Sequence, residues 1–148
     1  MGDYHILLVD DNEDDRYCFQ LAIGELGEMY RLDCCSNSEL IQQYINKSKP
    51  DLIFMDINMP NKTGIECLGE LKQHKEYSQI PVIMYSVSSN EQDQKASFNA
   101  GAHYYFIKPY AEKVLVTTLK KIFQTDWKVV QAIPQWNEFV IDLDFSVI

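Results

Sequence analysis

The sequence predicts an α/β fold in which helices cover both faces of a doubly wound parallel sheet. Two observations predict it: five short apolar runs recur along the chain, and segments with helical spacing of apolar residues separate them. Strands that alternate with helices are joined by right-handed crossovers, which make the strands parallel and place helices on both faces. The expected strands are residues 4–10, 30–36, 51–57, 80–86 and 103–109.

The composition of the runs predicts the order of the strands. The first, third and fourth runs (YHILLVD, DLIFMDI and IPVIMYS) are almost wholly apolar, as expected for strands buried on both faces. The second run, YRLDCCS, alternates in polarity, which is typical of a half-exposed edge strand. An edge position for the second strand and interior positions for the first and third predict a five-stranded sheet of order 2-1-3-4-5, the flavodoxin-like order.

Helices are expected between these strands, and the fourth is the weakest. Residues 89–100 contain only three apolar positions, which predicts a short helix with a solvated outer face or, alternatively, a mobile or partner-facing helix. Asn12, Asn37 and Ser89 are the expected N-caps. The other helices are indicated by apolar residues at helical spacing: Phe19, Ile23 and Leu26; Leu40, Ile41, Tyr44 and Ile45; Ile65, Leu68 and Leu71; Val114, Leu115, Thr118, Leu119, Ile122 and Phe123.

Composition limits the class of protein. The 148 residues, 46% of them hydrophobic, fit one domain (residues 1–124) with a short extension (residues 125–148). A net charge of −9 argues against binding to nucleic acid or to an anionic membrane surface. We find no membrane-spanning run and no secretory signal. The four cysteines form no CxxC pair, so we expect small buried hydrophobes in a reducing, cytoplasmic compartment.

Polar residues end four of the expected strands. Strand one ends in Asp10 and Asp11, strand three in Asp56, strand four in Ser86 and strand five in Lys108. In a doubly wound sheet, ligands bind beyond the carboxyl ends of the strands, where the strand order reverses. We therefore expect three carboxylates, a hydroxyl and an ammonium to converge at one edge.

This set of groups suits phosphoryl transfer. Neighbouring carboxylates raise each other's pKa, and a hard divalent cation such as Mg²⁺ relieves their repulsion. An aspartate can attack phosphorus to give an aspartyl phosphate. Mg²⁺ and a lysine can neutralise the charge that develops, and a serine hydroxyl can hydrogen-bond a phosphoryl oxygen.

The motifs VDDN, FMDINMP, MYS and FIKP, in this order at expected strand ends, resemble those of response-regulator receiver domains of two-component signalling. The resemblance covers residues 4–124. It implies that Asp56 is the phosphoacceptor, that Asp11 binds Mg²⁺ directly and Asp10 through water, and that the Asn58 backbone carbonyl completes the protein ligands. It also implies that Lys108 pairs with the phosphoryl group.

The resemblance further implies a conformational switch. Ser86 would be the switch hydroxyl, and Tyr105 the aromatic residue that rotates inward when Ser86 moves toward the phosphate. Pro109 would follow a cis peptide bond. Asn58 and Ser88 would flank the water that hydrolyses the phosphoryl group. The partner-binding face would be formed by helix four, strand five and helix five.

The resemblance implies a sensor histidine kinase or a phosphotransfer protein as phosphodonor, and a downstream protein partner that the sequence does not identify. A phosphorelay carrier is the first alternative. A phosphatase of the haloacid dehalogenase type would need an acid at position 58, where Asn58 cannot transfer protons. A degenerate receiver would lack an acid, the serine or the lysine. His5, His74 and His103 match no functional position and are expected to have surface or packing roles.

The extension carries a strand pattern. Trp127 and Trp136 add large apolar area. We expect this segment to fold back on its own domain or, alternatively, to form a dimer arm or an added strand on a partner's sheet edge. The strand pattern consists of apolar residues that alternate with polar ones: Phe139, Ile141, Leu143, Phe145 and Val147.

The acid-rich stretch LLVDDNEDDR divides into two sets. Asp10 and Asp11 end the strand and are the predicted metal ligands. Glu13, Asp14 and Asp15 fall in the first helical turn, where negative charge meets the positive end of the helix dipole. These three are expected to be solvated.

Overall fold

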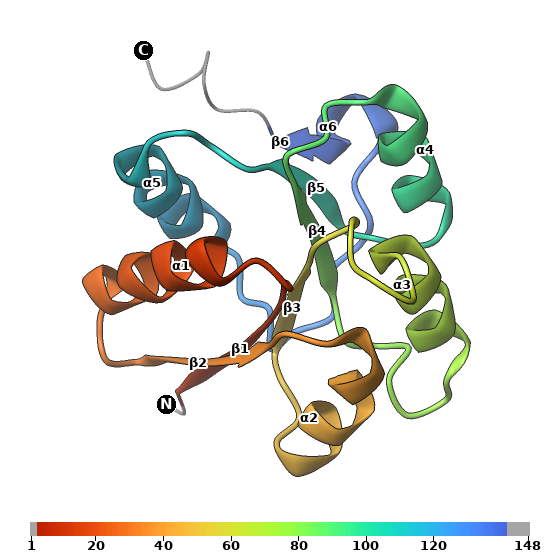
Figure 1. The fold of residues 1–148 in the computed structure, drawn as a ribbon, viewed down its shortest axis with the longest axis horizontal. Helices are drawn as coiled ribbons and strands as arrows, with labels where there is room; N and C mark the ends of the chain where they lie inside the picture. The colour runs from red at the N-terminus through yellow and green to blue at the C-terminus, as the bar shows by residue number, and fades with distance from the viewer. Residues whose placement is uncertain (1–2, 142–148) are drawn as a thin grey trace.

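The computed structural model describes residues 3–141, which form one parallel sheet flanked by helices (Figure 1). The strand order is β2-β1-β3-β4-β5-β6. The strands are β1 (Tyr4–Val9), β2 (Tyr30–Cys35), β3 (Leu52–Met55), β4 (Val82–Ser86), β5 (Tyr104–Ile107) and β6 (Val140–Ile141). The helices are α1 (Glu13–Leu26), α2 (Ile41–Lys47, after a short 3₁₀ turn, Ser38–Leu40), α3 (Gly64–Gln73), α4 (Glu91–Asn99), α5 (Glu112–Ile122) and α6 (Trp136–Phe139).

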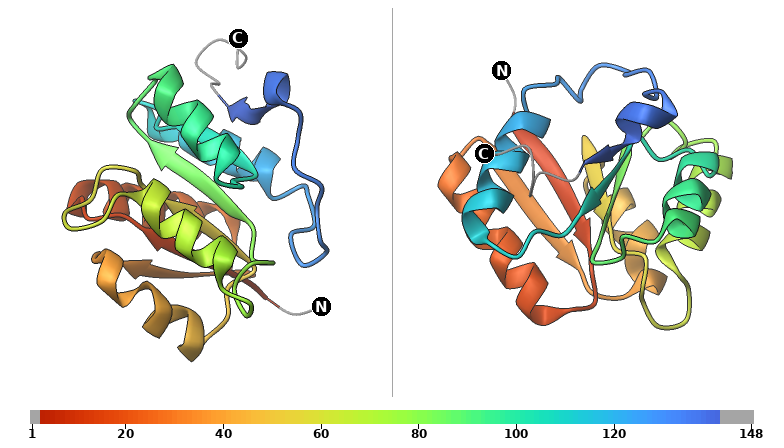
Figure 2. Two further views of the ribbon diagram at one scale, coloured as in Figure 1. Left: turned by 90° about the vertical axis from the view of Figure 1, so that its right-hand side faces the viewer. Right: turned by 90° about the horizontal axis from the view of Figure 1, so that it is seen from above.

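The helices form two layers over the sheet. Helices α1 and α5 cover one face, and α2, α3 and α4 cover the other (Figures 1 and 2). Each face has its own apolar core, one centred on Phe19, Phe54 and Leu119 and the other on Leu68 and Tyr105. Strands β3 and β4 are buried at every position, which explains why their sequences are apolar throughout.

The predicted order 2-1-3-4-5 is confirmed, with β2 as a half-buried edge strand. Helix α4 buries little surface against the sheet, as expected, because Ser97 is its one buried residue. Its N-cap is Asn90 and not Ser89: the Asn90 side chain accepts a hydrogen bond from the Gln92 N–H at 2.7 Å. Asn12 and Asn37 cap helical turns as predicted, through Asp15 and Glu39 respectively.

The predicted cis peptide bond before Pro109 is wrong. Every peptide bond among the described residues is trans. The trans form of an X–Pro bond is intrinsically the lower in energy, by about 0.5–1 kcal/mol. From the trans bond, the Lys108 ammonium already reaches the acids at the strand ends.

The extension folds back on its own domain, as one of the two expectations held. Trp127 is buried, and its indole N–H donates to the Ile122 carbonyl at 2.9 Å. Val140 pairs with Tyr105, so β6 adds a sixth, parallel strand to the sheet. Phe139 lies in α6 and not in a strand, because its fully buried ring packs against Phe98 on the α4 face.

Three positions of the predicted strand pattern, Leu143, Phe145 and Val147, lie outside the described residues. Among residues 3–141, no helix has both the length and the apolar composition that a bilayer span requires.

Gly64 joins the sheet to α3 at a close approach of two backbone segments. It begins α3, its N–H donates to the Ile57 carbonyl at 2.8 Å, and a Cβ atom at this position would overlap the carbonyl oxygen of Asp56. Backbone atoms cannot give way as a flexible side chain can. The absence of a side chain at Gly64 therefore sets how α3 meets the end of β3.

We expect Gly64→Ala to lower the free energy of unfolding by roughly 1–3 kcal/mol, as measured by chemical denaturation, because the added methyl group forces the backbone apart. Gly69→Ala is the matched control: it lies in the same helix with open space around the added Cβ. It should stabilise the protein by about 0.5–1 kcal/mol, since alanine favours the helix. Equal stability of Gly64→Ala and the wild type would contradict this packing.

Candidate functional site

The carboxyl ends of four adjacent strands bring the predicted polar residues together. Ladder-type hydrogen bonds continue past the strands: the Asp56 N–H donates to the Val9 carbonyl at 2.9 Å, and the Lys108 N–H donates to the Ser86 carbonyl at 2.8 Å. These bonds hold the residues that follow β3 and β5 beside the ends of β1 and β4. The side chains of Asp10, Asp56 and Ser86 are consequently buried at one edge of the sheet.

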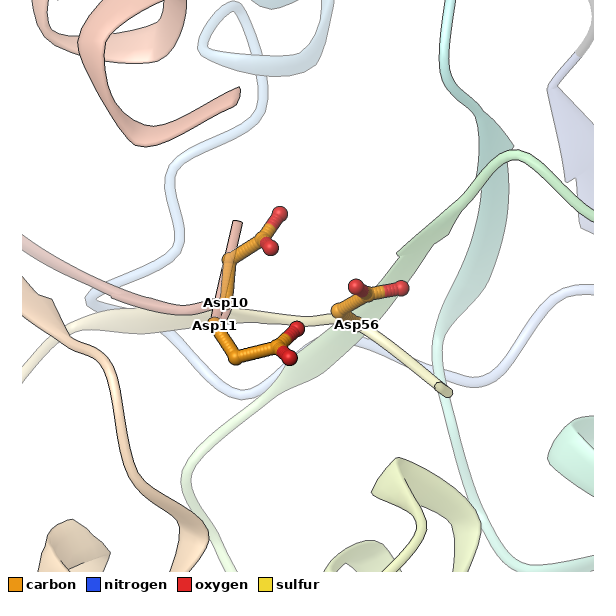
Figure 3. Close-up of side chains that lie close together, drawn as sticks. All are labelled: Asp10, Asp11 and Asp56. Atoms are coloured by element: carbon orange, nitrogen blue, oxygen red, sulfur yellow. The ribbon is translucent and has the colours of Figure 1, made fainter. Parts of the chain in front are cut away.

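Three carboxylates form a compact cluster at this edge. Asp10, Asp11 and Asp56 each offer an oxygen, and these oxygens lie within 4.8 Å of one another (Figure 3). Asp10 and Asp56 are buried, whereas Asp11 is exposed. The cluster therefore opens to solvent on the Asp11 side, where a small ligand can enter.

The Lys108 ammonium lies among the acids. Its Nζ is 2.8 Å from Asp10 Oδ2, 2.7 Å from Asp15 Oδ2 and 3.4 Å from Asp56 Oδ2. It also lies 5.2 Å from the centre of the Tyr85 ring. Burial lowers the pKa of Lys108, but its hydrogen bonds to Asp10 and Asp15 outweigh this and raise the pKa above the ordinary value. Lys108 is therefore charged and is shared between three carboxylates.

The expectation that Asp15 is merely solvated is wrong, because it is one of the closest partners of Lys108. Asp15 lies three residues after the N-cap Asn12, whose side chain accepts a hydrogen bond from the Asp15 N–H at 2.9 Å. Side chains in a helix tilt toward its N-terminus, so an acid at this position leans back over the strand end. That tilt is the signal that identifies Asp15. Glu13 and Asp14 are exposed, as predicted.

Asp56 has the perturbed acidity of a functional carboxyl group. Burial raises its pKa, the Lys108 ammonium lowers it and the Asp10 carboxylate raises it, and the net result is a pKa of about 6. One carboxylate oxygen, Oδ1, accepts a hydrogen bond from the Ile57 N–H at 2.8 Å. The other, Oδ2, faces Lys108. The ionised form is thus poorly solvated, and positive charge brought near it is favourable.

The donor set fits a hard divalent cation. The Lys108 ammonium contacts the carboxylates of Asp10, Asp15 and Asp56, and Asp11 lies beside two of them. The Arg16 guanidinium donates to the Asp10 backbone carbonyl at 3.0 Å, so four carboxylates face two cationic groups and negative charge is in excess at the strand ends. Carboxylate oxygens are the ligands that Mg²⁺, Ca²⁺ and Mn²⁺ prefer. Asn58 follows as an exposed residue, and the role of its backbone carbonyl stays a prediction.

Ser86 and Tyr105 meet at one residue of the loop after β4. The Ser86 Oγ accepts a hydrogen bond from the Ser88 N–H at 3.2 Å, and the Tyr105 hydroxyl donates to the Ser88 carbonyl at 2.8 Å. Tyr105 lies on the α4 face of the sheet, whereas Tyr104 and Phe106 lie on the α1 and α5 face. Of these three neighbouring aromatic residues, Tyr105 is the one whose hydroxyl reaches the loop beside the acids.

None of the histidines lies at the acid cluster. The His5 ring contacts Asp33 at 2.7 Å, His74 stacks on Tyr77, and His103 is buried at the opposite end of β5. The four cysteines are free, but the expectation that all are buried is wrong for Cys18, which is exposed on α1.

The raised pKa of Asp56 predicts how stability depends on pH. The folded state holds this proton up to about pH 6, whereas the unfolded chain releases it near pH 3.8, so the carboxyl group destabilises the fold as the pH rises between these values. We expect Asp56→Asn to be more stable than the wild type at pH 7, by roughly 1–3 kcal/mol. The difference should vanish below about pH 4.

Urea unfolding in metal-free buffer from pH 4 to pH 8 measures this difference. Asp14→Asn, which removes an exposed acid from the first turn of α1, is the control and should show no such trend. If Asp56→Asn is less stable than the wild type at pH 7, the claim that burial raises the pKa of Asp56 is contradicted.

Comparison with known proteins places this geometry in a family. A family model described as the response regulator receiver domain matches residues 6–120. The response regulator Rcp1 of Synechocystis is 33% identical over 143 residues, which are 91% of this chain and 90% of that protein. The phosphate regulon regulatory protein PhoB of Pseudomonas aeruginosa is 31% identical over 121 residues, and the match spans 51% of its length.

Solved structures agree. The phosphorylated cyanobacterial phytochrome response regulator RcpA superposes with a TM-score of 0.78 at 28% identity, over 90% of this chain and all of that one. The Mn²⁺-bound form of Rcp1 superposes with a TM-score of 0.74 at 27% identity, over 89% and 99% of the two chains. This likeness extends over the acid cluster and sets aside the phosphatase alternative. The chain belongs to the response-regulator receiver family, and it is a signalling domain, not an enzyme.

Proposed function

We propose that Asp56 is the aspartate on which this receiver accepts a phosphoryl group, in a Mg²⁺-dependent reaction. The observation that carries the proposal is the environment of Asp56: a buried carboxyl group at a strand end, 3.4 Å from a lysine ammonium and clustered with two further acids. The donor is the phosphohistidine of a sensor histidine kinase or of a phosphotransfer protein. Receivers take phosphate from such proteins, and the histidines of this chain lie away from the site.

The chemistry is an in-line displacement on phosphorus. A carboxylate oxygen of Asp56 forms the new O–P bond while the N–P bond of the donor histidine breaks, and the imidazole leaves with the electron pair. The Ile57 N–H fixes Asp56 Oδ1, which leaves Oδ2, on the Lys108 side, as the attacking atom. Asp10, Asp11 and Asp56, with the Asn58 backbone carbonyl, would hold Mg²⁺, and the bound ion would offset negative charge on the phosphoryl oxygens.

Lys108 changes partners in this scheme. In the unmodified protein, its ammonium donates hydrogen bonds to Asp10, Asp15 and Asp56. A phosphoryl group on Asp56 brings oxygens with more charge than a carboxylate, and we infer that Lys108 turns to them and weakens its contact with Asp15. Loss of that contact frees the first turn of α1.

The same event would move the switch residues. The Ser86 hydroxyl oxygen accepts a hydrogen bond from the Ser88 N–H, and the Ser86 side chain also contacts the Tyr105 hydroxyl. We infer that the Ser86 hydroxyl turns toward a phosphoryl oxygen and draws the loop with it, while Tyr105, which is already buried, follows through its bond to Ser88. The face formed by α4, β5 and α5 then changes shape for a partner protein.

We also propose the limits of the domain and its setting. Residues 1–124 form the receiver domain and residues 125–148 an extension, in keeping with a family match that ends at residue 120. A homodimer through the extension or through α4, β5 and α5 is favoured by exposed apolar residues on the extension, and light scattering tests it: Val129, Val130, Ile133 and Trp136. Four free cysteines fit a reducing, cytoplasmic location.

Acetyl phosphate with Mg²⁺ tests the acceptor assignment, since it needs no kinase. Mass spectrometry should find one phosphoryl group on the wild type and none on Asp56→Asn, because the amide is not a nucleophile. Lys108→Met should be phosphorylated at least about tenfold more slowly, because the ammonium that reduces the repulsion between the carboxylates and acetyl phosphate is lost. Asp14→Asn is the matched control and should label as the wild type does. Undiminished labelling of Asp56→Asn would refute the assignment.

A further inference from the structure

A second concave region lies at the opposite end of the sheet from the acids. It is a cavity of about 620 Å³. Its walls come from the segments that precede β3, β4 and β5 and from residues 127–133 of the extension. Figure 2 shows the extension running past this end of the sheet on its way from α5 to α6.

The cavity carries positive charge in a protein of net charge −9. Lys49, Lys72 and Lys128 line it together with one acid, Asp51. Asp51 is already neutralised, because its Oδ2 lies 3.4 Å from Lys128 Nζ and accepts a hydrogen bond from the His5 N–H at 2.9 Å. Within residues 3–141, neither Lys49 nor Lys72 forms an ion pair, so two lysine charges are left uncompensated at the cavity.

Lys72 is placed to receive an anion. Its half-buried ammonium donates to the carbonyls of Ser78 at 3.2 Å and Ile80 at 2.9 Å. A lysine ammonium has three donors, so one remains for a further acceptor. Burial lowers the pKa of Lys72, and an anion bound beside it would offset that cost.

His103 joins the wall of the cavity to the extension. Its side chain is 8% exposed, and its Nε2 lies 3.0 Å from the Gln131 carbonyl, which can only accept. Nε2 therefore carries the proton, and Nδ1 of the neutral ring is a hydrogen-bond acceptor. Nδ1 is buried and has no partner among the described residues. Because Nδ1 is enclosed by neighbouring protein atoms, a ligand in the cavity does not reach it, and His103 contributes to the site by holding Gln131 in the wall.

The rest of the wall combines polar and apolar residues. The polar ones are Ser78, Gln79, Asn99 and Gln131, and the larger apolar ones are Trp127, Ile80, Pro81, Val130 and Ile133. The volume falls within the range of about 300–1,000 Å³ that is usual for small-molecule sites. A ligand that fits has an anionic head and an apolar body.

We propose that this cavity binds a small organic anion, a carboxylate or a phosphate monoester. The head group contacts Lys72, and the body lies against the exposed apolar side chains of Val130 and Ile133, beside Trp127. The matched receiver segment ends at residue 120, so the wall that includes Trp127 and Gln131 belongs to the extension. The site is thus a consequence of how the extension docks, and it is independent of phosphorylation at Asp56.

Trp127 fluorescence tests the proposal in Mg²⁺-free buffer. The full chain with Trp136→Phe retains Trp127 as its one tryptophan. The probes are two matched pairs: 4-hydroxybenzoate with 4-hydroxybenzamide, and adenosine monophosphate with adenosine. At least one acid should give a saturable change with a Kd below about 1 mM and bind about tenfold more tightly than its neutral partner. No saturable change with either acid up to about 10 mM, or equal binding of acid and neutral probe, would overturn the proposal.

Variants locate the site. Lys72→Met should weaken binding of the acid at least about tenfold, and Lys72→Arg should restore most of it, which separates loss of charge from loss of fold. Lys75→Met removes an exposed lysine shortly after α3 and should bind as the parent does. Asp56→Asn should also leave binding unchanged. Wild-type affinity in Lys72→Met, or lost affinity in Lys75→Met, would show that the anion binds elsewhere.

Discussion

The ammonium of Lys108, shared between the carboxylates of Asp10, Asp15 and Asp56, is the interaction on which the functional end of the molecule depends. Buried carboxylates at such distances are tolerated only with positive charge beside them. One lysine offsets only part of this charge, so the acid cluster keeps an excess of negative charge. This excess favours binding of a divalent cation. After phosphorylation, the phosphoryl oxygens can accept the hydrogen bonds that the Lys108 ammonium now donates to the carboxylates.

The parallel sheet brings Lys108 and the three carboxylates together. Parallel strands end at one edge, and their ladder bonds continue to Asp56 and Lys108, so residues distant in sequence arrive within hydrogen-bond distance. Gly64 lets α3 approach the Asp56 backbone, and Asn12 holds the first turn of α1 so that Asp15 leans over the strand end. The positions of the acid cluster, of Lys108 and of the loop after Ser86 are therefore determined mainly by the backbone.

The sequence predicted the sheet order and most of the site because both follow from local pattern: apolar runs identify buried strands, and polar residues at their ends must meet. It missed Asp15, since an acid in a first helical turn is explained equally well by the helix dipole. It placed Phe139 in a strand because alternation cannot reveal that the ring packs under α4. The cavity beside Lys72 is lined by segments from four parts of the chain, so no local sequence pattern predicts it.

Binding of Mg²⁺ to the unmodified protein tests the central claim, a deficit of positive charge at the strand ends, most directly. The melting temperature of the wild type should rise with Mg²⁺ concentration, since the ion binds the folded acid cluster; at a hundredfold excess over Kd the gain is about 2.7 kcal/mol. Asp11→Asn, which removes the exposed acid of the cluster, should lose most of this rise, whereas Asp14→Asn should keep it. An unchanged melting temperature of the wild type in millimolar Mg²⁺, or an equal rise in Asp11→Asn, would contradict the account.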